Sequence, residues 1–115
     1  MQVELQRTHH VLIVRLEGEL DHHTATEVRA TIDHEWEKGI DSHLVLNLAG
    51  VHFMDSSGLG VILGRYKRVM ESRGSMKVCN VSDAIQKLMD MSGLFKILDL
   101  YEHEEQAISA CEVAS

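Results

Sequence analysis

The spacing of apolar side chains changes from alternation to a helical period along the first third of the chain. Apolar residues stand at Val3 and Leu5 and again along Val11 to Leu16, which predicts two strands joined by a hairpin turn at 8–10. Gly18 is expected to end the second strand. A helix should follow, because residues 24–27 have the form of a capping box and apolar residues then recur at helical spacing. These apolar residues are Val28, Ile32 and Trp36.

The rest of the chain repeats the strand–helix order. A nearly continuous apolar run at 44–48 is typical of a strand that is covered on both faces. The next segment has a helical stripe made of Leu59, Ile62, Leu63, Tyr66 and Met70. We then expect a strand at 76–81, a helix at 82–93, and a short edge strand or extended connection at 97–100. A last helix begins at Glu104, where carboxylates favour the helix start.

This alternation of strands and helices predicts one α/β domain over residues 1–115. The alternation implies right-handed crossovers and a largely parallel sheet, to which the first hairpin adds an antiparallel strand. We therefore expect a mixed, mostly parallel sheet of four or five strands with about four helices. A chain of 115 residues has room for one such domain and little more.

Charge and composition exclude several classes of protein. The net charge is −7, from 11 basic and 18 acidic side chains, which argues against a nucleic-acid partner. No apolar run approaches the roughly 20 residues that cross a bilayer, and the polar N-terminus does not resemble a signal peptide. Cys79 and Cys111 lack CxxC spacing and are expected to be reduced thiols. These observations predict a cytoplasmic protein that does not contact a membrane.

The candidate functional segments are two loops that each follow a predicted strand. In open α/β sheets, sites form beyond the carboxyl ends of parallel strands. The segments 18–24 and 54–58 both fit this description, so they should meet at one end of the sheet if their strands are neighbours. The polar candidates in them are Asp21, His22, His23, Asp55, Ser56 and Ser57.

Ser56 has two interpretations. Serine is a preferred N-cap, so its hydroxyl could simply bind a free N–H of the following helix. Alternatively, it could carry a phosphate, which would face the positive end of the helix and its unpaired N–H groups. Asp55 would repel that phosphate, and the local surface would change from neutral to strongly anionic.

Gly60 and Gly64 lie inside the predicted helix, where each destabilises it by about 1 kcal/mol relative to alanine. Together with Ser56 they are spaced at i, i+4 and i+8, nearly on one helix face. This strip could let the backbone of a partner approach closely, or it could pack against the protein's own sheet. Arg65, Lys67 and Arg68 are expected to form a solvated face of the same helix.

Other chemistries have weaker support. A hydrolase could use Ser56 with a nearby histidine, but the chain lacks the GxSxG elbow. The glycines at 58–64 follow a strand, but the last is one residue late for GxGxxG, and no P-loop is present. The histidine pairs at 9–10 and 22–23 do not form an HxxxH or Cys/His cluster, so neither metal nor cofactor is expected.

Four segments resemble the STAS family, named for sulfate transporters and anti-sigma factor antagonists. They are residues 18–25, 45–48, 53–67 and 90–97, so the resemblance extends across nearly the whole chain. It implies that the non-phosphorylated protein binds an anti-sigma factor that is also a serine kinase, and thereby frees a sigma factor in sporulation. It further implies that the kinase phosphorylates Ser56, with Ser57 as the rival acceptor, and that the phosphoprotein then dissociates.

The same resemblance assigns the remaining roles. A PP2C-type phosphatase would restore binding, and ATP and Mg²⁺ would belong to the kinase, so the chain itself would be a substrate and ligand without a cofactor and would not be an enzyme. The predicted partner surface consists of Asp21, His22, His23, Asp55, Ser56, Ser57, Gly58, Gly60 and Gly64.

Overall fold

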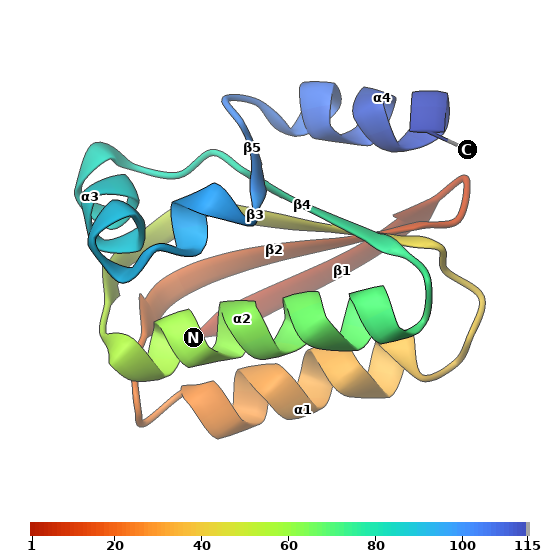
Figure 1. Cartoon of the computed structure of the whole chain (residues 1–115). Coiled ribbons are helices and arrows are strands. Elements are labelled where there is room, and N and C mark those ends of the chain that lie inside the picture. The colour runs from red at the N-terminus through yellow and green to blue at the C-terminus, as the bar shows by residue number, and fades with distance from the viewer. Residues whose placement is uncertain (115) are drawn as a thin grey trace.

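The computed structural model describes residues 1–114, which form a five-stranded sheet with helices on both faces (Figure 1). The strands lie in sequence order, with β1 antiparallel to β2 and all other neighbours parallel. The predicted mixed, mostly parallel α/β sheet is therefore confirmed. The elements are β1 (Gln2–Thr8), β2 (Val11–Leu20), α1 (Ala25–Trp36), β3 (His43–Met54), α2 (Ser56–Glu71), β4 (Ser75–Cys79), α3 (Asp83–Ser92), the 3₁₀ turn η1 (Leu94–Lys96), β5 (Asp99–Tyr101) and α4 (Glu104–Ala114).

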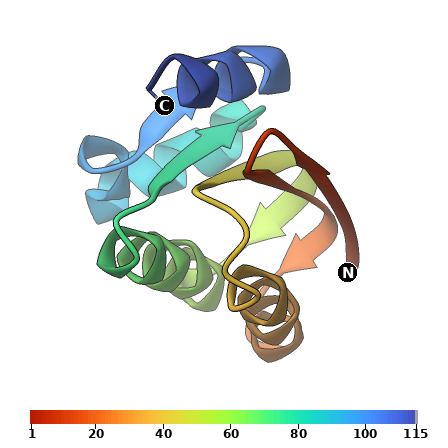
Figure 2. The ribbon, with the colours of Figure 1, turned by 90° about the vertical axis from the view of Figure 1, so that its right-hand side faces the viewer.

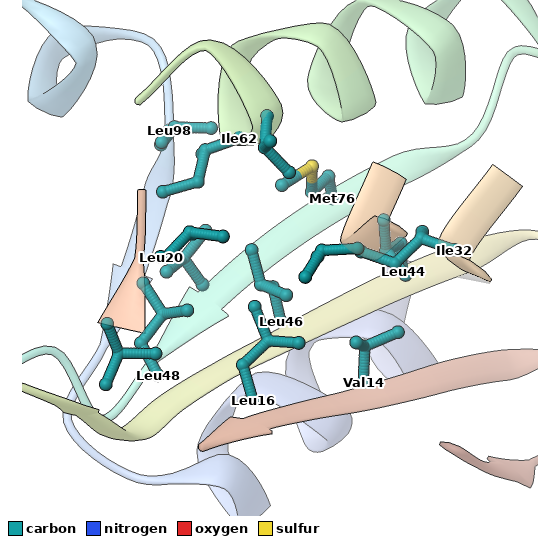
Figure 3. Close-up of a cluster of buried hydrophobic side chains, with 14 of the residues drawn as sticks. Val14, Leu16, Leu20, Ile32, Leu44, Leu46, Leu48, Ile62, Met76 and Leu98 are labelled. Atoms are coloured by element: carbon teal, nitrogen blue, oxygen red, sulfur yellow. The ribbon is translucent and has the colours of Figure 1, made fainter. Parts of the chain in front are cut away.

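The helices α1, α2 and α3 share one face of the sheet, and α4 covers the other (Figures 1 and 2). Leucine, isoleucine, valine and methionine side chains from the strands and the first three helices converge on the main core (Figure 3). A smaller cluster lies beneath α4 and consists of Val11, Ile13, Val45, Cys79, Ala107 and Cys111. Because β2 and β3 are covered on both faces, their sequences contain nearly continuous apolar runs.

A charged network also fixes α4 to the sheet. The Arg15 guanidinium of β2 donates from Nε and Nη2 to the two carboxylate oxygens of Glu104, each at 2.8 Å. Asn47 of β3 donates to the same carboxylate at 2.9 Å. The Arg15 hydrogen bond holds the pKa of Glu104 below its usual value, against partial desolvation. The start of α4 is therefore held over β2 and β3 by an ionised carboxylate.

The predicted hairpin between β1 and β2 is confirmed, and its loop consists of two residues. His9 and His10 have φ angles of 49° and 66°, as required by a type I′ turn, whose twist matches that of the strands. Gly18 does not end β2, because the strand continues to Leu20. Instead Gly18 has a φ of 123° at a shift in the β2–β3 register, a conformation that suits glycine.

The predicted strand at 44–48 is the first half of a longer one. β3 continues to Met54, which lies opposite Leu20 at the end of β2. β4 pairs with β3 only as far as Asn47, so beyond that point β2 is the only strand paired with β3 within residues 1–114. This two-stranded extension was not expected, because residues 49–53 mix apolar and polar side chains without a clear alternation.

The predicted stripe of α2 is confirmed except at Met70, because Ile62 is buried and Leu59, Leu63 and Tyr66 are half-buried against the main core. Met70 is 47% exposed, and the buried residues are Gly58, Val61, Ile62, Arg65 and Val69. The buried face of α2 extends beyond this stripe toward α1, which packs along one side of the helix. Arg65, expected to be solvated, is only 6% exposed and pairs with Asp33 of α1 at 2.8 Å. Arg68 pairs with Glu37, the residue that follows α1, and Lys67 is exposed.

The helix and the edge strand predicted after residue 81 are both present, with small shifts in their bounds. α3 begins after Ser82, whose side chain accepts a hydrogen bond from the Ile85 N–H, and it ends at Gly93 in the left-handed region. The expected edge strand at 97–100 lies slightly later, as β5, because η1 occupies the preceding residues.

Candidate functional site

The loop between β2 and α1 and the junction between β3 and α2 lie together at one end of the sheet, as predicted. The Asp55 N–H donates to the Leu20 carbonyl at 3.4 Å, and the His22 N–H donates to Asp55 Oδ2 at 3.3 Å. The starts of α1 and α2 are neighbours in Figure 1, at the end of the sheet where these two strands finish. The parallel pairing of β2 with β3 brings these segments together.

Asp55, and not Ser56, is the N-cap of α2. Its backbone is extended, and its Oδ1 accepts hydrogen bonds from Ser57 N–H at 2.9 Å and Gly58 N–H at 3.2 Å. The interpretation of Ser56 as a cap is therefore wrong, because the carboxylate one residue earlier already occupies that position.

Ser56 is the first residue of α2 and is exposed. Its hydroxyl makes no hydrogen bond to any other group within residues 1–114. The expectation that a phosphate here would meet unpaired N–H groups needs correction, because Asp55 already binds those of Ser57 and Gly58. A phosphate on Ser56 would compete with this carboxylate for the helix start.

The Asp55 carboxylate is held in its ionised form. Desolvation raises its pKa, but hydrogen bonds from three backbone N–H groups and from the His22 side chain lower the pKa below its usual value. Asp55 is therefore an anion at neutral pH, beside the Ser56 hydroxyl.

A second aspartate shapes the loop before α1. Asp21 is only 7% exposed, and its Oδ1 accepts from the His23 N–H at 2.9 Å and the Thr24 N–H at 3.2 Å. The Thr24 hydroxyl donates to the Glu19 carbonyl at 2.8 Å and makes no cap bond to α1. The predicted capping box at 24–27 is therefore wrong, because the end of β2 offers the threonine hydroxyl a competing acceptor.

This loop presents His22 and His23 at the surface. Their ring centroids are 3.9 Å apart, and His22 Nδ1 lies 3.7 Å from Asp55 Oδ2. Across the described residues, no histidine is hydrogen-bonded to the Ser56 hydroxyl, so the geometry offers no activated serine. Residues 1–114 contain no group of three or more His, Cys, Asp or Glu side chains that could hold a metal ion.

The glycines of α2 serve different purposes. A Cβ on Gly58 would lie 2.4 Å from the Leu20 carbonyl oxygen, so this glycine lets the first turn of α2 pack against the end of β2. A Cβ on Gly60 or Gly64 would meet nothing within 4 Å. The alternative that the strip of Ser56, Gly60 and Gly64 packs against the protein's own sheet is therefore wrong, and the strip faces open space.

The sequence pattern assigned Thr24 to a helix cap and did not single out Phe53, and both residues lie at this end of the molecule. Thr24 ties the loop to β2, and Phe53 is 48% exposed at the end of β3. Extending the strand pattern to buried Met54 would have placed Phe53 on the outward side. No local signal distinguishes the role of Thr24 from a helix cap.

No helix within residues 1–114 has the length and apolar character needed to span a membrane.

The sequence and the fold were compared with those of known proteins. A family model described as the STAS domain matches residues 2–107. An anti-sigma F factor antagonist of Paenibacillus polymyxa is 50% identical over 115 residues, which are 100% of this chain and 98% of that protein.

Two solved structures have the same fold. One is the anti-sigma factor antagonist SpoIIAA in its unphosphorylated form, with 30% identity, a TM-score of 0.75, and coverage of 95% of this chain and 96% of that chain. The other is the Bacillus cell fate determinant SpoIIAA in the phosphorylated form, with 33% identity, a TM-score of 0.75, and coverage of 95% and 98%. The chain therefore belongs to the STAS domain family, and it is similar over its whole length to anti-sigma factor antagonists.

Proposed function

We propose that the protein is an anti-sigma factor antagonist controlled by phosphorylation of Ser56. The non-phosphorylated form binds an anti-sigma factor that is also a serine kinase, and so frees a sigma factor in sporulation. The kinase phosphorylates Ser56, the complex dissociates, and a PP2C-type phosphatase restores binding. The observation that carries the proposal is the exposed Ser56 hydroxyl, without a hydrogen bond in residues 1–114, on a chain similar to a protein whose phosphorylated form has been solved.

The partner surface surrounds this hydroxyl. The exposed histidines of the β2–α1 loop lie on one side, and the open strip through Gly60 and Gly64 continues along α2. Gly58 and Asp21 are buried and shape the surface from beneath, whereas Ser57 is half-buried. Ser57 is therefore the second choice as acceptor, since its side chain is less accessible than that of Ser56.

The energetics suit a switch that needs no refolding. Phosphorylation adds about −2 of charge beside the ionised Asp55, in a chain of net charge −7. Leaving such a charge unpaired in an interface costs several kcal/mol, and each 1.4 kcal/mol lowers affinity about tenfold. ATP and Mg²⁺ belong to the kinase in this scheme, and this chain is its substrate.

The test uses a candidate anti-sigma kinase with ATP and Mg²⁺, followed by tandem mass spectrometry and a sizing column. Ser56→Ala should still bind the kinase but resist phosphorylation, and Ser56→Asp should bind weakly with an unchanged circular-dichroism spectrum. Ser57→Ala is the matched control and should be phosphorylated normally. Phosphate retained in Ser56→Ala would move the site elsewhere, and a collapsed spectrum for Ser56→Asp would make the serine structural.

A further inference from the structure

The two oxygens of the Asp55 carboxylate bind two different elements of the site. Oδ1 accepts from the N–H groups of Ser57 and Gly58 in α2. Oδ2 accepts from the His22 N–H in the loop after β2, and it lies 3.7 Å from the His22 ring. One side chain thus joins the helix that carries Ser56 to the loop that carries the two histidines.

No other side chain forms this connection within residues 1–114. The remaining direct hydrogen bond at this place runs from the Asp55 N–H to the Leu20 carbonyl, at 3.4 Å, and it precedes the loop. Asp21 stabilises the loop internally, through the N–H groups of His23 and Thr24, without reaching α2. The position of His22 relative to Ser56 therefore depends on the Asp55 carboxylate.

We propose that Asp55 is a positioning residue, which holds the histidine loop and the Ser56 helix together as one surface for the kinase and does not accept the serine proton. This inference rests on the proposed function and assigns a role within it. Both carboxylate oxygens already accept hydrogen bonds, and neither is bonded to the Ser56 hydroxyl in the described structure.

The phosphoryl transfer then balances without Asp55. Ser56 Oγ forms a bond to the γ-phosphorus of ATP, and the bond from that phosphorus to the bridging oxygen of ADP breaks. ADP leaves, and the hydroxyl proton passes to a basic side chain that the kinase supplies. Asp55 contributes by keeping the acceptor and the contact loop in one arrangement before the kinase binds, which lowers the ordering cost of association and so favours binding more than the chemical step.

The variant Asp55→Asn tests this role. Asparagine is as good an N-cap as aspartate, so its carbonyl oxygen can still bind α2, but its amide group then faces the His22 N–H with a second donor. We expect KM for phosphorylation to rise about tenfold, as for the loss of one hydrogen bond to a charged group, with kcat nearly unchanged. The pH profile of kcat should keep its shape.

Two outcomes of the kinetics would overturn the proposal. A fall in kcat of about 100-fold or more at unchanged KM would make Asp55 the general base. Wild-type values of both constants would show that the bridge is irrelevant to the kinase. Ser82→Ala is the matched control, because it removes the side-chain cap of α3, and it should leave both constants unchanged.

A measurement on the free protein separates this proposal from the proposed function. Hydrogen exchange of the His22 amide should accelerate in Asp55→Asn, while the Ser57 and Gly58 amides stay protected. Unchanged exchange at His22 would overturn the bridge. If the bridge is present but no kinase phosphorylates wild-type protein at Ser56, the proposed function fails and with it the role of the bridge in phosphorylation.

Discussion

Alanine substitutions along α2 should distinguish the glycine that the fold needs from those that the surface needs. In Gly58→Ala, the new Cβ would lie 2.4 Å from the Leu20 carbonyl oxygen and 2.5 Å from Met54 Cγ. The first contact is with backbone and cannot be relieved by a rotamer change. We expect a loss of about 1–3 kcal/mol in the free energy of unfolding, as for overpacking elsewhere, after the gain in helix propensity is included.

Gly60→Ala and Gly64→Ala should have the opposite sign. Nothing lies within 4 Å of a Cβ at either position, so only helix propensity changes. Each variant should gain up to about 1 kcal/mol, which corresponds to about 4 °C in Tm for a domain of this size. Both should nevertheless bind the kinase more weakly, because a methyl group would then stand on the strip beside Ser56.

The assay is urea unfolding followed by fluorescence of Trp36, the only tryptophan, which is 7% exposed in the core. Kinase affinity is measured on the same three variants. Destabilisation by Gly60→Ala or Gly64→Ala comparable to that of Gly58→Ala would refute the argument that the strip is open. Increased stability with unchanged affinity would remove the strip from the partner surface.

Glu104→Gln should lower the free energy of unfolding by about 1.5–3 kcal/mol at neutral pH, because Arg15 loses the carboxylate that binds its Nε and Nη2 and keeps only the more exposed Glu4. The folded pKa of Glu104 is below its ordinary value of 4.5, so the stability that its charge contributes is complete above pH 4.5 and is lost as the pH falls through the folded pKa. Urea unfolding that shows the same loss of stability in Glu104→Gln at pH 2 as at pH 7 would contradict this prediction. Burial raises the pKa of the Cys79 thiol to about 12, so iodoacetamide at pH 8 should label Cys79 only after unfolding, and mass spectrometry showing rapid labelling of the folded protein would contradict this.

The sheet and the shared end of the two loops could be predicted from the sequence because they depend on patterns that extend over many residues. The apolar run at 44–48 and the helical spacing of Val28, Ile32 and Trp36 correctly indicate a covered strand and an amphipathic helix. Because β2 and β3 are parallel neighbours, Asp21 and Asp55, which follow these strands, lie at the same end of the sheet.

The errors concern choices among neighbouring polar groups. Asp55 and Ser56 are both good N-caps, and only the path of the backbone decides that the aspartate takes the position. Thr24 could cap α1 or bind the end of β2, and its geometry selects the strand. Arg65 is charged and lies where a solvated face was expected, but its pairing with Asp33 depends on how α1 lies against α2. Such competition depends on tertiary contacts and has no signature in the sequence.

The two-stranded extension of β2 and β3 has a consequence for motion. In the first half of β3, backbone groups are paired on both sides, by β2 and by β4, whereas residues 48–54 pair with β2 alone. The extension therefore has fewer backbone hydrogen bonds than the central sheet, and it is held mainly by the side chains of Leu48, Val51 and Met54, which are buried in the main core. The end of the molecule that carries Ser56 can therefore move only if these side chains leave the core, which gives a binding partner a surface of nearly fixed shape.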